Sequence, residues 1–294
     1  MLHRAGRSAA ATVTAFVVAL ASAPAMAEDA ACAVPPGGLP IVAPLERSAA
    51  RIVQGEPLTI VAMGSSSTSG VGASRPDLTY PSRLESDLRQ VFPNLDIHVV
   101  NRGKGGEDAP EELARLGRDV IEAHPDLAVW QVGTNAVLRR DNLVADGEWL
   151  REGVDLLQRS GIDVVLMDLQ YAPRVLERSA YPAMEEMIAA AADHAHVGLY
   201  RRFALMRYWQ RSHASDAAPM VGPDGLHMTD TGYGCLAEDL AAALESNWRA
   251  EAKLAQRARG REAPAGEFRW LPLAASHSIQ PPSDMRRNDA TPFN

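Results

Sequence analysis

The stretch LTIVAMGSSSTSG, residues 58–70, joins a short apolar run to a polar segment of glycine, serine and threonine. The run has the length and the β-branched composition of a strand, whereas the small residues after it are typical of a loop. We therefore predict a buried strand over LTIVAM (58–63). The polar segment has the composition of a linker, of a phosphate-binding loop or of a turn that presents a nucleophile. Its context along the chain must distinguish these possibilities.

Other strands and helices are predicted on both sides of this stretch. Apolar runs of similar character are LDIHVV (95–100), DLAVWQV (126–132) and DVVLMDL (163–169). Apolar stripes at helical spacing lie between and after them: Leu113, Leu116, Val120 and Ile121, then Leu150, Val154 and Leu157, and last Leu236, Leu240, Leu244 and Trp248. Alternation of strands and helices indicates a doubly wound parallel sheet whose strands are buried on both faces. The predicted fold is a three-layer α/β/α domain.

The first residues have the pattern of a secretory signal peptide. A positively charged start with Arg4 and Arg7 precedes the apolar segment 9–21, and Ala25-Met26-Ala27 is a cleavage signature. The apolar segment is short for a membrane span, although a retained anchor is the alternative. We expect residues 1–27 to be removed and the protein to be exported, periplasmic or secreted, without a stable membrane anchor.

The mature chain is predicted to hold one folded domain. Residues 28–50 are expected to form a Pro/Gly-rich N-terminal strap, and residues 51–249 the α/β domain. Residues 250–294 read first as a helical extension and then, from Ala263, as a disordered tail.

Composition excludes two classes of partner. The chain of 294 residues has a formal net charge of −8 and a pI of about 5.5, which argues against nucleic acid and anionic membranes. Aromatic residues make up 5% of the chain, too few for a base-stacking surface.

Three polar segments directly follow predicted strands: GSSSTSG (64–70), NRGKGGED (101–108) and GTNA (133–136). Because the carboxyl ends of parallel strands meet at one edge of the sheet, these segments should lie close together. Phosphate binding is disfavoured, since Gly64 and Gly70 are one residue too far apart for a P-loop and Val71 stands where lysine is needed. Asp108 and Glu111 instead form a capping-box pattern for the next helix.

A fourth segment, VGPDGLHMTDTGY (221–233), contains Asp224 and His227 in a Gly/Pro-rich turn. Such a pair on its own is often an ordinary surface feature. Next to a serine turn it supplies the parts of nucleophilic catalysis, since a carboxylate can hold Nδ1–H of the imidazole while Nε2 accepts the serine proton.

These four segments, in order, resemble the conserved blocks of the SGNH/GDSL hydrolase superfamily over about two thirds of the chain. The resemblance implies a flavodoxin-like fold and a serine esterase. It implies that Ser66, the middle serine of GSSSTSG, is the nucleophile, with His227 as general base and Asp224 as its partner. It also implies an oxyanion hole made by the N–H groups of Ser66 and Gly106 and by the side-chain amide of Asn135.

Two positions depart from the family pattern. Ser65 replaces the aspartate that usually precedes the nucleophile, and Ala136 replaces an acidic residue often found after the asparagine. We expect the hydrogen bonds around the serine turn to differ accordingly, while fold and reaction class persist.

Rival functions are acyl transfer to a sugar hydroxyl and an inactive exported binding protein on the same fold. The expected substrate is a small-molecule or polysaccharide ester, with acyl-chain length and oligomeric state left open. No metal or organic cofactor is required. The histidines of DHAH (193–196) are expected to be a surface pair, and Arg139 with Arg140 a solvated pair.

The two cysteines offer one possible disulfide. Cys235 lies one position off the last apolar stripe, so it should project toward the surface, within reach of Cys32 in the strap. Export would favour oxidation, and two unpaired thiols are the alternative.

Overall fold

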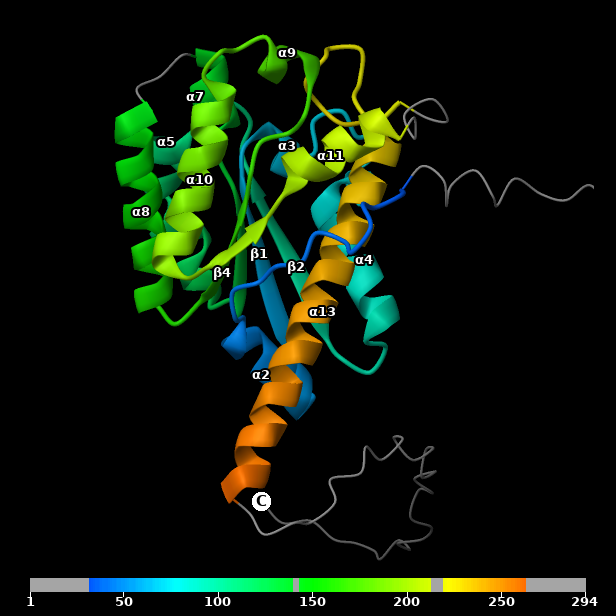
Figure 1. The fold of residues 1–294 in the computed structure, drawn as a ribbon, viewed down its shortest axis with the longest axis vertical. Coiled ribbons are helices and arrows are strands. Elements are labelled where there is room, and N and C mark those ends of the chain that lie inside the picture. Colours follow the sequence, from blue (N-terminus) through cyan, green and yellow to red (C-terminus); the bar gives the residue numbers. More distant parts are fainter. Residues whose placement is uncertain (1–31, 140–142, 213–218, 263–294) are drawn as a thin grey trace, which may run out of the picture. The chain divides into compact units, whose positions relative to one another are not determined.

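A computed structural model describes residues 32–139, 143–212 and 219–262, and the side chains of these ranges up to residue 258 (Figure 1). The predicted signal peptide, Arg140 and the predicted tail from Ala263 lie outside the described residues.

The centre of the fold is a parallel sheet, as predicted. Its strand order is β2-β1-β3-β4-β5, and every neighbouring pair is parallel. The strands are β1 Leu58–Gly64, β2 Ile97–Gly103, β3 Leu127–Gln131, β4 Asp163–Met167 and β5 Gly198–Tyr200. The chain leaves β1 toward β2 on one side and β3 lies on the other, so the strand order reverses at β1, the kind of position at which open α/β sheets bind ligands.

Helices cover both faces of the sheet, which confirms the three-layer prediction (Figure 1). On β1, Ile60 and Ala62 belong to one core cluster, and Val61 and Met63 belong to the other. The first cluster is closed by α2 Glu46–Gln54, α4 Tyr80–Val91, α11 Arg202–Arg211 and α13 Asp230–Glu262. The second is closed chiefly by α6 Leu116–Asp119, α8 Leu143–Arg159 and α10 Tyr181–Ala195.

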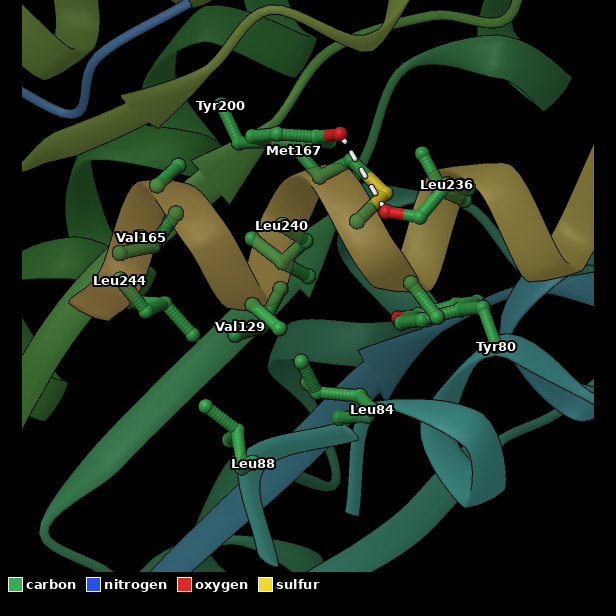
Figure 2. Close-up of a cluster of buried hydrophobic side chains, with 14 of the residues drawn as sticks. Tyr80, Leu84, Leu88, Val129, Val165, Met167, Tyr200, Leu236, Leu240 and Leu244 are labelled. Carbon is green, nitrogen blue, oxygen red and sulfur yellow. Dashed lines mark hydrogen bonds between the residues drawn. The ribbon is translucent and has the colours of Figure 1, made fainter. Parts of the chain in front are cut away.

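The stripe predicted on the last helix packs into the first cluster. Leu236, Leu240 and Leu244 are fully buried, and Figure 2 shows Leu240 and Leu244 near Val129 and Val165 of the sheet and Leu236 near Met167. Leucines repeated at a spacing of four lie on one face of a helix, so this face of α13 covers the sheet.

The sheet differs from the predicted one at both edges. β5 was not expected, because a three-residue strand that begins with glycine has no strand-like signal. The prediction that all strands are buried on both faces is wrong for β2, in which Ile97 alone is buried. β2 lies at the edge of the sheet, and it also continues to Gly103, three residues into the segment predicted as a loop.

The helix predicted from Leu113 to Ile121 is not continuous. The structure has α5 Ala109–Leu113, α6 and a 3₁₀ turn η2 Ile121–Ala123, with a break at Ala114 and Arg115. The capping box predicted at the start of α5 is confirmed. The Asp108 side chain accepts the backbone N–H of Glu111, and the Glu111 side chain accepts the backbone N–H of Asp108. The break lets Arg115 turn its side chain inward, where it is 7% exposed.

The segment before α2 runs along α13 and is tied to it. Cys32 and Cys235 form a disulfide, and the Asn247 side chain donates hydrogen bonds to the carbonyls of Ile41 and Ala43. The expectation that Cys235 projects to the surface is wrong, because the side chain is 1% exposed. The strap covers the face of α13 that carries Cys235. The spacing of apolar residues along one helix cannot predict such a contact with a distant segment.

The compact α/β unit ends at Leu254, within α13. Among the helices that the structure describes, none combines the length and the apolar character that a membrane crossing needs.

Candidate active site

Ser66 lies where the first parallel strand ends. It is the first residue of α3, Ser66–Ser69, which follows β1 after Ser65. The first N–H groups of a helix have no partner within the helix, so the geometry leaves the Ser66 N–H available to a ligand. Ser65 and Ser67 are 4% and 2% exposed, whereas Ser66 is only partly buried.

The side chain of Gln131 organises the turn that contains Ser66. Gln131 Oε1, at the end of β3, accepts hydrogen bonds from the N–H and the hydroxyl of Ser65, each at 3.2 Å, and from the hydroxyl of Thr68 at 3.3 Å. The Thr68 hydroxyl is also 3.2 Å from that of Tyr80. A buried network with these partners holds the turn in place.

Asp224 and His227 are joined by a compact turn. Asp224 Oδ1 accepts the N–H groups of Leu226 and His227, both at 3.0 Å, and Oδ2 lies 2.5 Å from His227 Nδ1. The Gly222 N–H donates to the His227 carbonyl at 2.7 Å, which closes the turn. Both carboxylate oxygens therefore orient the histidine, one through its backbone and one through its ring.

The other ring nitrogen faces the serine. His227 Nε2 lies 2.8 Å from Ser66 Oγ, so the structure brings Ser66, His227 and Asp224 into one hydrogen-bonded line. Gly72 permits this approach, because a Cβ at that position would lie 2.3 Å from the Met228 carbonyl oxygen and 3.1 Å from His227 Cβ.

The electrostatics of the pair favour an ionised aspartate. Burial opposes ionisation of Asp224, but hydrogen bonds from the His227 side chain and from the two backbone N–H groups outweigh it and lower the pKa of the carboxyl. A carboxylate that stays negative stabilises an imidazolium when one forms.

The glycine and asparagine predicted from the sequence lie beside this line. The loop after β2 passes Ser66 at Gly105, where a Cβ would lie 3.8 Å from Ser66 Cβ, and Gly106 has φ +82°, a conformation that favours glycine. Asn135, in α7 Thr134–Arg139, donates from Nδ2 to the Glu107 carbonyl at 2.6 Å. An amide has two N–H donors, so the second can serve a bound oxyanion.

Two charged residues behind the loop were not found from the sequence. Arg115 and Glu107 form a buried ion pair, with Arg115 Nε 2.5 Å from Glu107 Oε2. Burial opposes ionisation of Glu107, but Lys104 and Arg115 lower its pKa. The helical period gave no signal for this burial, because a continuous helix would place Arg115 on the face opposite Leu113 and Leu116.

A second buried acid lies close by. Glu112 is 1% exposed, and burial raises its pKa to about 8 even though Trp130 Nε1 donates to it at 2.7 Å. Near neutral pH this side chain therefore keeps its proton.

The residues set aside in the sequence remain peripheral. His194 and His196 are exposed at the end of α10, and no group of three or more His, Cys, Asp or Glu side chains in the described part of the chain could hold a metal ion. Arg139 is exposed but not merely solvated, since it donates to the Gly106 carbonyl and lies 3.7 Å from Glu111. Separately, Tyr171, Met206 and Val221 line a pocket of about 460 Å³.

The sequence matches the model of one protein family. The Non-GDSL lipase-like family matches residues 31–249. No curated protein matches the chain significantly by sequence.

Solved structures of esterases share the fold. A two-domain esterase active on acetylated mannans superposes with a TM-score of 0.61 and 21% identity, covering 73% of this chain and 56% of its own. This chain thus spans little more than half of that protein. An acetyl xylan esterase superposes with a TM-score of 0.55 and 19% identity, covering 63% of this chain and 99% of its own. A lipase/acylhydrolase from Enterococcus faecalis superposes with a TM-score of 0.55 and 18% identity, covering 64% of this chain and 96% of its own.

Proposed function

The chain belongs to the Non-GDSL lipase-like family and is a carboxylic ester hydrolase of the SGNH/GDSL-like kind, and we propose that it is an exported serine esterase. In this proposal Ser66 is the nucleophile, His227 the general base and acid, and Asp224 the partner of the histidine. The observation that carries it is the line of contacts from Asp224 Oδ2 through the imidazole to Ser66 Oγ, at 2.5 and 2.8 Å.

The reaction follows from these contacts. Ser66 Oγ attacks the ester carbonyl carbon while His227 Nε2 takes the hydroxyl proton, and Asp224 stabilises the imidazolium. The tetrahedral intermediate collapses when Nε2 returns this proton to the leaving alkoxide, which leaves an acyl-enzyme. Water then repeats the cycle, giving its proton to Nε2 and releasing the acid and Ser66.

The negative charge that develops on the carbonyl oxygen needs fixed donors. We assign these to the N–H of Ser66, the N–H of Gly106 and the free Nδ2–H of Asn135. The hydrogen bond from Asn135 to the Glu107 carbonyl supports this assignment, since it ties the amide to the residue that follows Gly106. Donors that are held before the reaction stabilise the transition state without having to reorganise.

The proposed substrate is an O-acetyl or other short acyl ester on a saccharide or small alcohol. Two of the solved neighbours are described as acting on acetylated mannans and as an acetyl xylan esterase, which suggests this class. Ser66 is partly exposed and Gly106 is exposed, so a large alcohol such as a polysaccharide can approach the nucleophile.

Export is the second part of the proposal. Its support is the signal-peptide pattern of residues 1–27 and the disulfide of Cys32, five residues after the predicted cleavage point, since disulfides persist in oxidising compartments. Cell fractionation with N-terminal sequencing tests it, and mature protein that begins near Glu28 outside the cytoplasm is the expected result.

The enzymatic proposal is tested with p-nitrophenyl acetate, butyrate and octanoate, and with acetate release from acetylated xylan and mannan. We expect the acetate ester to be hydrolysed fastest and Ser66→Ala to lose at least about a thousandfold in kcat. A wild-type enzyme without turnover or acyl-enzyme burst would favour the inactive binding protein. Acetylated saccharide formed from an added acceptor would favour the acyltransferase.

A further inference from the structure

Arg115 is a buried cation that the proposed reaction does not use directly. Its side chain is 7% exposed and lies at the break between α5 and α6. Burying a guanidinium is unfavourable unless its donors are matched by acceptors, so its partners show what it is there to hold.

Those partners belong to three separate segments beneath the candidate site. Nε donates to Glu107 Oε2 at 2.5 Å, Nη1 to the Arg102 carbonyl at 2.8 Å, and Nη2 to the Gly64 carbonyl at 3.1 Å. Nη1 also lies 2.9 Å from Asp119 Oδ2 in α6. One planar group therefore joins the end of β1, the end of β2 and the loop that follows β2.

Two of these segments lead directly to donors of the proposed oxyanion hole, and the third donor is reached through Glu107. Gly64 stands two residues before Ser66, and Glu107 directly follows Gly106. The carbonyl of Glu107 in turn accepts the amide of Asn135 at 2.6 Å. The relative positions of all three donors thus depend on contacts that Arg115 makes.

We propose that Arg115 is a positioning residue that holds the oxyanion-hole donors of this esterase in a single arrangement, with Glu107 as its link to Gly106 and Asn135. This inference rests on the proposed function and adds to it a residue outside the Ser-His-Asp line. The rigid fork of guanidinium supplies donors in three directions at once, which the single ammonium of lysine cannot do in the same geometry. Oxyanion donors displaced by a fraction of an ångström stabilise the transition state less while still admitting substrate.

The test compares Arg115→Lys and Arg115→Met with a matched control, Arg118→Met. Arg118 is 70% exposed and pairs with Asp119 as Arg115 does, but the structure gives it no contact with the three segments. Folding is checked by circular dichroism and thermal unfolding, and kinetics are measured with p-nitrophenyl acetate.

We expect both Arg115 variants to lower kcat by about 10- to 100-fold with KM changed by less than about threefold, because substrate binding precedes development of the charge. Arg118→Met should behave as wild type. Glu107→Gln, which keeps the shape but weakens the link, should give a smaller loss of the same kind. A structural role alone would lower the melting temperature but leave kcat of the folded fraction unchanged.

Folded Arg115 variants with kcat within about threefold of wild type, or with a raised KM and unchanged kcat, would overturn the inference. The proposed function would still stand in that case, provided that the wild-type protein is active. If Arg115→Met does not fold, Arg115→Lys and Glu107→Gln decide in the same way. An inactive wild type, or activity that persists in Ser66→Ala, would overturn the proposed function and this inference together.

Discussion

His227 Nε2 and Ser66 Oγ lie 2.8 Å apart although 161 positions separate the two residues in the chain. The turn that begins at Asp224 delivers the histidine to the end of β1, and Gly72 leaves space for it. Of the serines in the GSSSTSG segment, Ser66 makes this contact, and its neighbours Ser65 and Ser67 are buried.

The first prediction concerns the identity of the nucleophile. Ser66→Ala should abolish labelling by a fluorophosphonate, because no other hydroxyl in GSSSTSG contacts His227 in the structure. Ser65→Ala and Ser67→Ala should still be labelled. Gel fluorescence after brief exposure measures this, and labelling lost only in a neighbour's variant would place the nucleophile elsewhere.

The second prediction is a loss of turnover in Asn135→Ala. The amide is proposed to contact the oxygen only as charge develops, so kcat should fall about 100-fold or more with a modest change in KM. Asn94, exposed between α4 and β2, provides the control Asn94→Ala, which should not change either constant. An unchanged kcat in Asn135→Ala would remove this residue from the oxyanion hole.

The third prediction is the pH dependence of hydrolysis. An imidazole must be neutral to accept the Ser66 proton, so kcat/KM should rise with pH through the range in which histidines titrate. Asp224 stays ionised across this range because its pKa is lowered. Stopped assays from acid to alkaline pH measure the profile, and His227→Gln should lose both the activity and the rise. A flat profile in wild type would contradict the role of His227.

The fourth prediction is a loss of stability, caused by Glu112, as pH rises from about 4.5 to about 8. Its pKa is raised from 4.5 to about 8, so between these values the folded state keeps a proton that the unfolded state has lost. Stability should therefore fall as pH rises through this range, by at most about 5 kcal/mol in the free energy of unfolding.

Glu112→Gln removes this titration and can still accept the Trp130 N–H. The variant should match wild type near pH 5 and unfold at higher denaturant concentration near pH 9. Glu122→Gln, at an exposed position nearby, is the control and should keep the wild-type pH dependence. Parallel curves for wild type and Glu112→Gln would show that Glu112 is not the responsible group.

The fifth prediction concerns the disulfide between Cys32 and Cys235, which are 203 positions apart. In the chain-entropy model, cross-linking so long a loop raises the free energy of the unfolded chain by about 5 kcal/mol. Reduction of the disulfide should therefore lower the free energy of unfolding by up to that amount. Denaturant curves with and without reductant measure this, with Cys32→Ser as the reductant-insensitive control. Intact-mass analysis under denaturing alkylation should show no alkyl groups without reductant, and two groups added would rule the bond out.

Much of the fold was predictable because its signals are local. Apolar β-branched runs located β1, β3 and β4 to within one or two residues, and the leucines of α13 identified its buried face. Both depend on periodicity within one segment. The errors occurred where neighbours decide the structure: β5 exists because β4 offers it hydrogen bonds, and β2 extends to Gly103 because β1 continues beside it.

The amino-acid sequence indicated that three polar loops meet at one edge of the sheet, because the carboxyl ends of parallel strands lie together. It was the resemblance to a known family that selected Ser66, Gly106 and Asn135 among the residues of these loops, and that added Asp224 and His227. The supporting contacts became known from the folded chain: Gln131 next to Ser65, Arg115 across three segments, and the strap over Cys235. The physical reason is that a buried polar group must find partners wherever the fold brings acceptors near, and sequence distance carries no information about them.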